Sequence, residues 1–192
     1  MAARTGMTQL ISTLRDMGVA GTADYTLGTV TYWTDVQLQT VLDKHKLTVV
    51  REKLTPVESY NAGTVVYMEY RSQYGYYEET SGGTAIFEIE DASGVTFGTT
   101  NWTADYTNGI ISFTANTAGT SYYLNGVSYD INRAASDVWR TKSGHHASGV
   151  DFSTDNMSVK RGQLMKNDIK MAEYYASQGR VKHLSFERED TT

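Results

Sequence analysis

The sequence predicts an α+β protein, in which a four-helix framework carries a large antiparallel β-sheet insertion between its second and third helices. Two observations place the helices: apolar residues recur at helical spacing over residues 34–45, and again over residues 131–175. A third places the sheet, because residues 60–129 show alternation, many Tyr and Thr residues and repeated turn signals. A helical pattern interrupted in this way is typical of a scaffold that carries an inserted module.

The first helix is predicted over residues 10–17, where apolar residues recur at i, i+4 and i+7 and form one stripe. Thr8 is the expected N-cap, and Gly18 or Gly21 is expected to end the helix. Residues 19–32 are polar and contain glycines, so they are expected to form a linker.

The second helix has the clearest local start signal in the chain. Thr34 and Gln37 fit a capping box, in which each side chain binds the backbone amide of the other residue. Trp33 and Leu38 are spaced to form a hydrophobic staple across this cap. The helix is expected to end near Leu47.

The insertion is predicted to contain short strands joined by turns. Residues 64–70 have strong β propensity, and residues 74–79 are their expected partner. Residues 85–90 alternate, and the turn at residues 91–94 is expected to bring the chain back over residues 95–98.

The second half of the insertion contains the strongest hairpin signal. Asn108-Gly109 separates two short β-like runs, residues 102–106 and 110–113. Tyr122 and Tyr123 are expected to close the sheet, after which Asn125-Gly126 is expected to turn the chain out of it.

Two more helices are predicted after the insertion. Asp130 is the expected cap of a helix whose apolar stripe runs from Ile131 to Trp139. Ser158 is the expected cap of the last helix, which Gly179 is expected to end from the C′ position.

The chain therefore divides into residues 1–54 (helical), 55–127 (the β insertion), 128–179 (helical) and 180–192 (a flexible charged tail). Periodicity turns one set of apolar and aromatic side chains toward the interior of the helical framework. These expected core residues are Trp33, Leu38, Leu42, Val138, Trp139, Leu164 and Tyr175.

Composition excludes several classes of protein. The 192 residues include no Cys, which rules out disulfides and thiolate metal sites and is compatible with a reducing cytoplasm. No apolar run approaches the length of a membrane helix, so no membrane partner is expected. The net charge of −5 argues against a general DNA-coating protein, which needs a basic surface.

The chain offers no convincing set of catalytic residues. His145 and His146 are adjacent, and neighbours on a helix point about 100° apart, whereas a chelating pair needs i, i+4 spacing. Glu88 and Glu90 share one face of a strand, where a solvated surface is the ordinary explanation. No nucleophile elbow, phosphate-binding loop or dinucleotide fingerprint occurs. No enzymatic activity, metal or cofactor is expected.

A local basic surface is expected at the start of the last helix, from Lys160, Arg161 and Lys166. These side chains are candidates for contact with DNA phosphate or with a neighbouring subunit. Solvated surface charge is the alternative interpretation.

Several stretches, taken in order, resemble the head-to-tail connector proteins of long-tailed double-stranded DNA bacteriophages, also called adaptor or head-completion proteins. The stretches that carry the resemblance are residues 10–17, 32–43, 129–139, 152–161 and 171–175. They cover the helical parts, a little over half of the chain. The β insertion departs from the minimal all-helical members of that family.

The resemblance implies a structural virion protein in the head-tail neck, made in the cytoplasm of the bacterial host. Such proteins form a ring of about twelve subunits under the portal. The ring prolongs the channel for double-stranded DNA, which passes without sequence-specific binding, and it presents a surface to the stopper, tail terminator or tail. In similar proteins the C-terminal segment contacts the portal. The residues of that segment here are Arg180, Val181, Lys182, Leu184, Phe186 and Arg188.

Two alternatives remain open at the level of sequence. A tail terminator or stopper protein is expected to be mainly β. A carbohydrate-binding module would use aromatic side chains such as Trp102, Tyr76 and Tyr77 as a platform for sugar rings.

Overall fold

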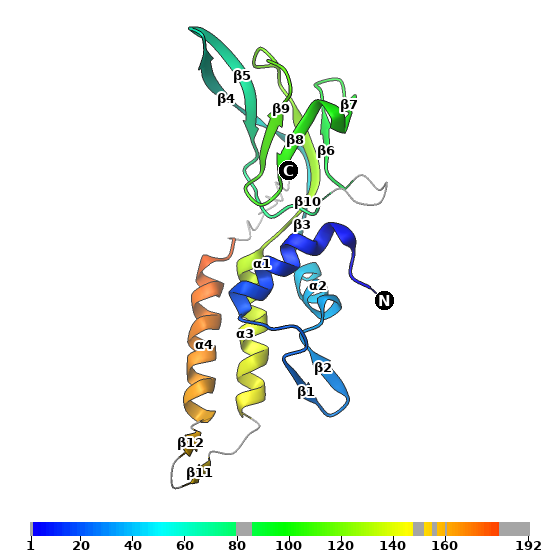
Figure 1. The fold of residues 1–192 in the computed structure, drawn as a ribbon. Coiled ribbons are helices and arrows are strands. Elements are labelled where there is room, and N and C mark those ends of the chain that lie inside the picture. Colours follow the sequence, from blue (N-terminus) through cyan, green and yellow to red (C-terminus); the bar gives the residue numbers. More distant parts are fainter. Residues whose placement is uncertain (1, 80–85, 148–151, 155–156, 160, 181–192) are drawn as a thin grey trace, which may run out of the picture.

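The computed structural model describes residues 2–79, 86–147, 152–154, 157–159 and 161–180. It confirms the α+β prediction, because four helices and antiparallel sheets are present and most strands lie between the second and third helices (Figure 1). The helices are α1 (Thr8–Gly18), α2 (Asp35–Asp43), α3 (Ile131–Ala147) and α4 (Arg161–Gln178).

The strands form two four-stranded sheets, with orders β3-β10-β6-β7 and β4-β5-β9-β8, and two separate hairpins, β1-β2 and β11-β12. The strands are β1 (Tyr25–Leu27), β2 (Val30–Tyr32), β3 (Lys46–Lys53), β4 (Thr55–Asn61), β5 (Thr64–Arg71), β6 (Glu88–Glu90), β7 (Thr96–Phe97), β8 (Trp102–Asp105), β9 (Ile110–Phe113), β10 (Tyr123–Tyr129), β11 (Phe152–Thr154) and β12 (Met157–Val159).

The described residues bury two separate hydrophobic cores. The first joins α1, α2 and α3, and includes Leu14, Trp33 and Val138. The second lies between the two sheets and is rich in aromatic rings, among them Tyr70 and Phe87. Strands β3 and β10 run from the helical part into the β part and connect the two (Figure 1).

The predicted start of α2 is confirmed in detail. The Gln37 amide donates to Thr34 Oγ1 at 3.4 Å, and the Thr34 amide donates to Gln37 Oε1 at 2.9 Å, which completes the capping box. Trp33 and Leu38, the predicted staple, are both buried in the helical core. The helix ends at Asp43 and not near Leu47, because β3 begins at Lys46.

The other helix starts agree in part with the sequence. Asp130 caps α3 as predicted, accepting from the Arg133 amide at 3.1 Å. Thr8 is not the cap of α1: its hydroxyl donates to the Thr5 carbonyl, because a 3₁₀ turn at Thr5–Met7 leads directly into the helix. Ser158 does not cap α4, since it lies in β12 and the helix begins at Arg161.

The pairing of β5 differs from the prediction. Residues 74–79 do not pair with β5, whose neighbours are β4 and β9. Those residues instead run beside β10, where Tyr77 and Ser128 form a bridge. The predicted linker over residues 19–32 contains the β1-β2 hairpin.

Two turn predictions had opposite outcomes. Asn108-Gly109 turns β8 into β9, with Gly109 at φ +66°, as predicted. Asn125-Gly126 does not turn the chain out of the sheet, because β10 continues through it with an irregularity in its pairing to β3. The space for a side chain at Gly126 is taken by the ring of Tyr77.

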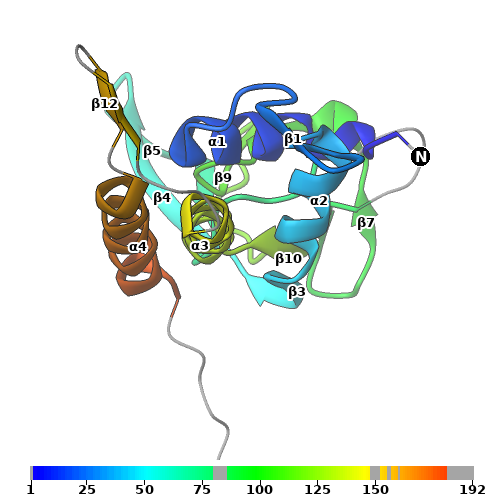
Figure 2. The same ribbon diagram turned by 90° about the horizontal axis from the view of Figure 1, so that it is seen from below.

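Helix α4 lies on the outer side of α3, away from α1 and α2 (Figure 2). Helix α4 therefore packs mainly against α3, and in the described part of the chain the opposite face of α4 is exposed to solvent. This placement explains one wrong core prediction: Leu164 is 45 % exposed. Tyr175 does pack partly buried against the helical core, and the remaining predicted core residues, Trp33, Leu38, Leu42, Val138 and Trp139, are buried.

Candidate functional site

The uncovered side of α4 carries an apolar strip. Ala172 and Asp168 are buried toward α3, whereas Leu164 and Tyr174, at 45 % and 57 % exposed, lie at the flank of the helix. Met171, seven residues after Leu164 and three before Tyr174, lies on the same side and is half-buried. We call Leu164, Met171 and Tyr174 the α4 strip. Leu164 and Tyr174 lie about 80° apart around the helix with Met171 between them, so the three side chains form a broad apolar flank, which is typical of an interaction surface.

The two histidines of α3 face different neighbours. His146 Nδ1 lies 2.6 Å from the buried carboxylate of Asp168, and this contact joins α3 to α4. His145 packs edge-on against the stacked rings of Tyr25 and Tyr32 in the β1-β2 hairpin. The described residues include no group of three or more His, Cys, Asp or Glu side chains that would hold a metal. The histidine pair therefore holds structural elements together.

A hollow of about 540 Å³ lies between the β1-β2 hairpin, the end of α1, α3 and α4. Lys142 occupies it: the ammonium donates to the carbonyls of Gly18 and Val19, each at 2.7 Å, and lies 4.9 Å from the centre of the Trp139 ring. Burial lowers the pKa of Lys142, while the charges of Asp24 and Asp168 act in the opposite direction. Carbonyls at a helix C-terminus attract a cation, so Lys142 closes the end of α1.

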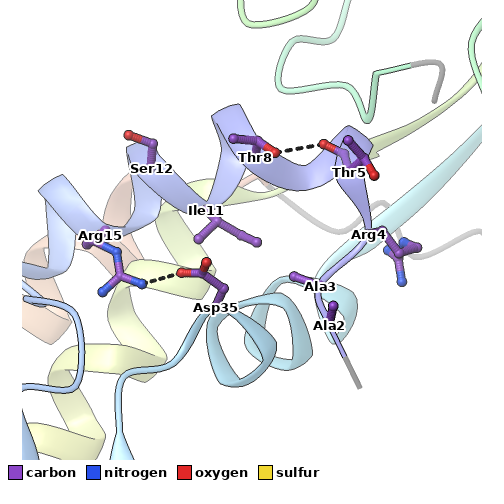
Figure 3. A pocket seen from close by; sticks show the side chains of 9 residues that line it. All are labelled: Ala2, Ala3, Arg4, Thr5, Thr8, Ile11, Ser12, Arg15 and Asp35. Carbon is purple, nitrogen blue, oxygen red and sulfur yellow. Dashed lines mark hydrogen bonds and ion pairs between the residues drawn. The ribbon is translucent and has the colours of Figure 1, made fainter. Parts of the chain in front are cut away.

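A second hollow, of about 480 Å³, lies between the N-terminal segment, α1 and the start of α2 (Figure 3). Its main charged groups are already paired. Arg15 Nη2 donates to Asp35 Oδ1 at 2.6 Å, and Arg15 Nη1 donates to the carbonyls of Gly21 and Trp33. The residues labelled in Figure 3 include no nucleophile held next to a base.

A charged cluster that the sequence did not reveal joins the N-terminal segment to the rest of the fold. Arg4 donates to the buried carboxylate of Glu78 and to Asp43, each at 2.7 Å, and Tyr129 OH donates to Glu78 at 2.6 Å. The hydrogen bonds to Asp43 and Glu78 raise the pKa of Arg4 above its ordinary value. Burial raises the pKa of the Tyr129 phenol, as does its hydrogen bond to Glu78. No short-range pattern links these residues, because they are far apart in the sequence.

Arg180 was predicted to belong to the flexible tail, and this is wrong. Its amide donates to Asp130 Oδ2 at 2.7 Å, and its guanidinium donates to the Gly75 carbonyl and to Ser128 Oγ. The guanidinium also lies 5.2 Å from the centre of the Tyr74 ring. Arg180 therefore fixes the end of α4 to the base of β10.

The structure places only part of the remaining predicted sites. Lys166 is exposed on α4, and Arg161 is the first residue of that helix. The predicted contact residue Lys160 lies outside the described residues, as do the predicted portal-binding residues Val181, Lys182, Leu184, Phe186 and Arg188.

The aromatic residues proposed as a sugar platform are not available for one. Trp102 is 4 % exposed and packs with Phe87 in the core between the sheets. Tyr77 is buried in the same core, and Tyr76 packs against the helical core. A sugar ring needs an exposed aromatic face, so these side chains do not form that platform.

Comparison of the chain with protein-family models, with curated proteins and with solved structures finds no match. None of the described helices is both long enough and apolar enough to cross a membrane.

Proposed function

We propose that this chain is a head-to-tail connector of a long-tailed double-stranded DNA bacteriophage. It is a structural virion protein of the neck, and it assembles as a ring between the portal and the tail. The proposal begins with the sequence resemblance over the helical parts. The α4 strip is the structural observation that carries it further.

The strip supports assembly because the described part of the chain leaves it exposed. Helix α4 packs against α3 (Figure 2), and Leu164 and Tyr174 remain 45 % and 57 % exposed. Covering apolar surface of this kind is the main driving force for association between subunits. In a closed ring each subunit contributes one such surface to its neighbour, so every strip is covered.

The division into two cores supports contacts at both ends of a neck. The helical framework has its own core, and the two sheets project from one end of it (Figure 1). The helical framework can therefore contact neighbouring subunits and the portal, or the stopper or tail, while the two sheets contact the partner at the other end of the neck. The net charge of −5 favours a channel that DNA passes through without being held.

The test is the mass of the particle in solution, measured by light scattering with and without portal protein. The wild-type chain should form a particle many times heavier than the 21.3 kDa monomer, and Leu164→Glu should shift it toward the monomer. The matched control is Val95→Glu, because Val95 is also exposed but lies in the turn before β7. A wild-type chain that stays monomeric even with portal protein would contradict the connector role.

A further inference from the structure

A series of hollows crosses β3 and begins where α4 ends. The first, of about 200 Å³, is lined by Arg180 and Tyr74. The second, of about 260 Å³, shares Tyr74 with the first and extends along Leu47 and Val50 of β3. The third, of about 320 Å³, shares Val50 with the second and continues toward β6 and β10. Neighbouring hollows share lining residues along β3, and we call the three together the β3 groove.

The β3 groove presents apolar side chains at an open sheet edge. Within the described residues, β3 pairs with β10 on one side and has no strand on its other side. Val50, in the middle of β3, is 72 % exposed, and Leu47, near its start, is 39 % exposed. An exposed edge with apolar residues is a ready site for pairing with an extended segment.

Arg180 holds the end of α4 at the mouth of this groove. Its guanidinium lies over Tyr74, the residue shared by the first two hollows, and donates to the carbonyls of Gly75 and Tyr129. Tyr129 pairs with Lys46, the first residue of β3. The chain therefore continues from a point beside the beginning of β3, and a segment that follows the groove would run parallel to that strand.

The length and chemistry of the next twelve residues, 181–192, fit the groove. At about 3.3 Å per extended residue, twelve residues reach about 40 Å, whereas the eight residues of β3 span about 26 Å. The apolar residues of this segment, Val181, Leu184 and Phe186, lie in its first half, and the apolar residues of β3 likewise lie in the first part of that strand. The acidic residues Glu187 and Glu189 follow, and exposed Lys53 lies at the far end of the strand.

We propose that residues 181–192 dock in the β3 groove of their own chain, adding an extended segment to the free edge of β3 and covering Leu47 and Val50. The docking needs no partner protein, and it does not depend on the connector role. If that role holds, the portal must compete with the groove for the same segment, so the groove keeps the segment covered until the portal is present.

The absence of Cys from the chain allows a direct test with paired cysteines. In the full-length double variant Val50→Cys/Phe186→Cys, mild oxidation should close a disulfide within one chain. The control is Val95→Cys/Phe186→Cys, because Val95 is also exposed but lies beside β7, at the opposite edge of the same sheet. We expect the first pair to close at least about tenfold faster than the control, as the higher effective concentration of a docked segment requires. The readout is intact mass together with non-reducing electrophoresis.

Equal closure rates for the two pairs would overturn the proposal, since they would mean that the segment has no preferred position. Disulfides that form only between chains would also overturn it, and would assign the groove to a second copy.

Hydrogen exchange gives an independent measurement on the full chain. Phe186→Glu changes only the docking segment, so it cannot unfold β3 by altering the strand. The variant should speed amide exchange in residues 46–50 severalfold and leave the α2 amides unchanged. Unchanged exchange in β3 would contradict the docking.

Discussion

Arg4 Nε and the Glu78 carboxylate lie 2.7 Å apart, although the two residues are 74 positions apart in the chain. Glu78 is buried, and it also accepts a hydrogen bond from Tyr129 at the end of β10. Asp43, the last residue of α2, accepts two hydrogen bonds from the other side of the same guanidinium. One arginine near the N-terminus therefore holds together α2, β10 and the segment that follows β5.

Replacing this arginine should destabilise the fold. Arg4→Met removes the cation and leaves the Glu78 carboxylate buried without its charged partner. Breaking a fully buried pair costs about 3–5 kcal/mol, and because the Arg4 side chain is 43 % exposed we expect about 1–3 kcal/mol. The free energy of unfolding in urea measures the loss. The matched control is Arg71→Met: Arg71 pairs with Glu69 at the surface and should cost no more than about 0.5 kcal/mol.

The same contact should make the effect of Arg4→Met depend on pH. Burial alone would raise the pKa of Asp43, but the hydrogen bonds and charge of Arg4 outweigh it and lower the pKa below the ordinary value. A carboxylate with a lowered pKa contributes stability above its unfolded pKa of about 3.9, and this contribution is lost as the pH falls through the folded pKa. The stability difference between wild type and Arg4→Met should therefore shrink below about pH 4. Urea titrations from pH 7 to pH 3 would show this, and a constant difference would contradict it.

The outer half of the β4-β5 hairpin should be dispensable for folding. The hairpin extends beyond the other strands (Figure 1), and Tyr60 near its tip is 72 % exposed. Replacing residues 59–66 with Asn-Gly would close a two-residue turn between the paired residues Glu58 and Tyr67. We expect the free energy of unfolding to change by less than about 1 kcal/mol, since little apolar surface is lost from the core.

Tyr70→Ala supplies the contrast for the shortened hairpin. Tyr70 lies at the inner end of β5, fully buried in the core between the sheets, and its truncation should cost about 3–5 kcal/mol.

Replacing the whole stretch 57–125 with a short linker would affect the helical part as well. It would remove Tyr76 from the helical core and Glu78 from Arg4, so we do not expect the helical part to fold unchanged without it.

Features encoded within a few residues were predictable from the sequence. The capping box at Thr34 and the hairpin turn at Asn108-Gly109 depend only on local backbone geometry, and both are present. The pairing of β5 with β4 and β9 was not predictable in the same way, because several strands of similar propensity compete for one edge.

The sites were harder to predict than the elements. Helical periodicity shows that Leu164 lies near an apolar face, but not whether other parts of the chain cover that face. Among the described residues, Leu164 stays 45 % exposed. Arg180 and Arg4 act through carbonyls and carboxylates brought to them by the fold. A lone arginine in a polar segment carries no sequence signal for such a role.

Two glycines in hairpin turns provide a final test of the packing between β9 and the segment after β5. Gly109 and Gly63 both have positive φ, +66° and +81°, so alanine at either position is strained by about 1–2 kcal/mol. Only Gly109 is also enclosed: an added Cβ would collide with the Tyr74 carbonyl oxygen, and the Ser72 amide donates to the Gly109 carbonyl at 2.9 Å. The same Cβ at Gly63 would meet nothing within 4 Å.

Gly109→Ala should therefore cost clearly more than Gly63→Ala, by about 2 kcal/mol or more, because backbone must move to relieve the collision. Urea unfolding of the two single variants under the same conditions measures the difference. Faster hydrogen exchange at Ser72 in Gly109→Ala alone would locate the damage at this contact. Equal losses for both variants would mean that the turn shifts away from Tyr74 freely, and that strain at positive φ is the whole effect.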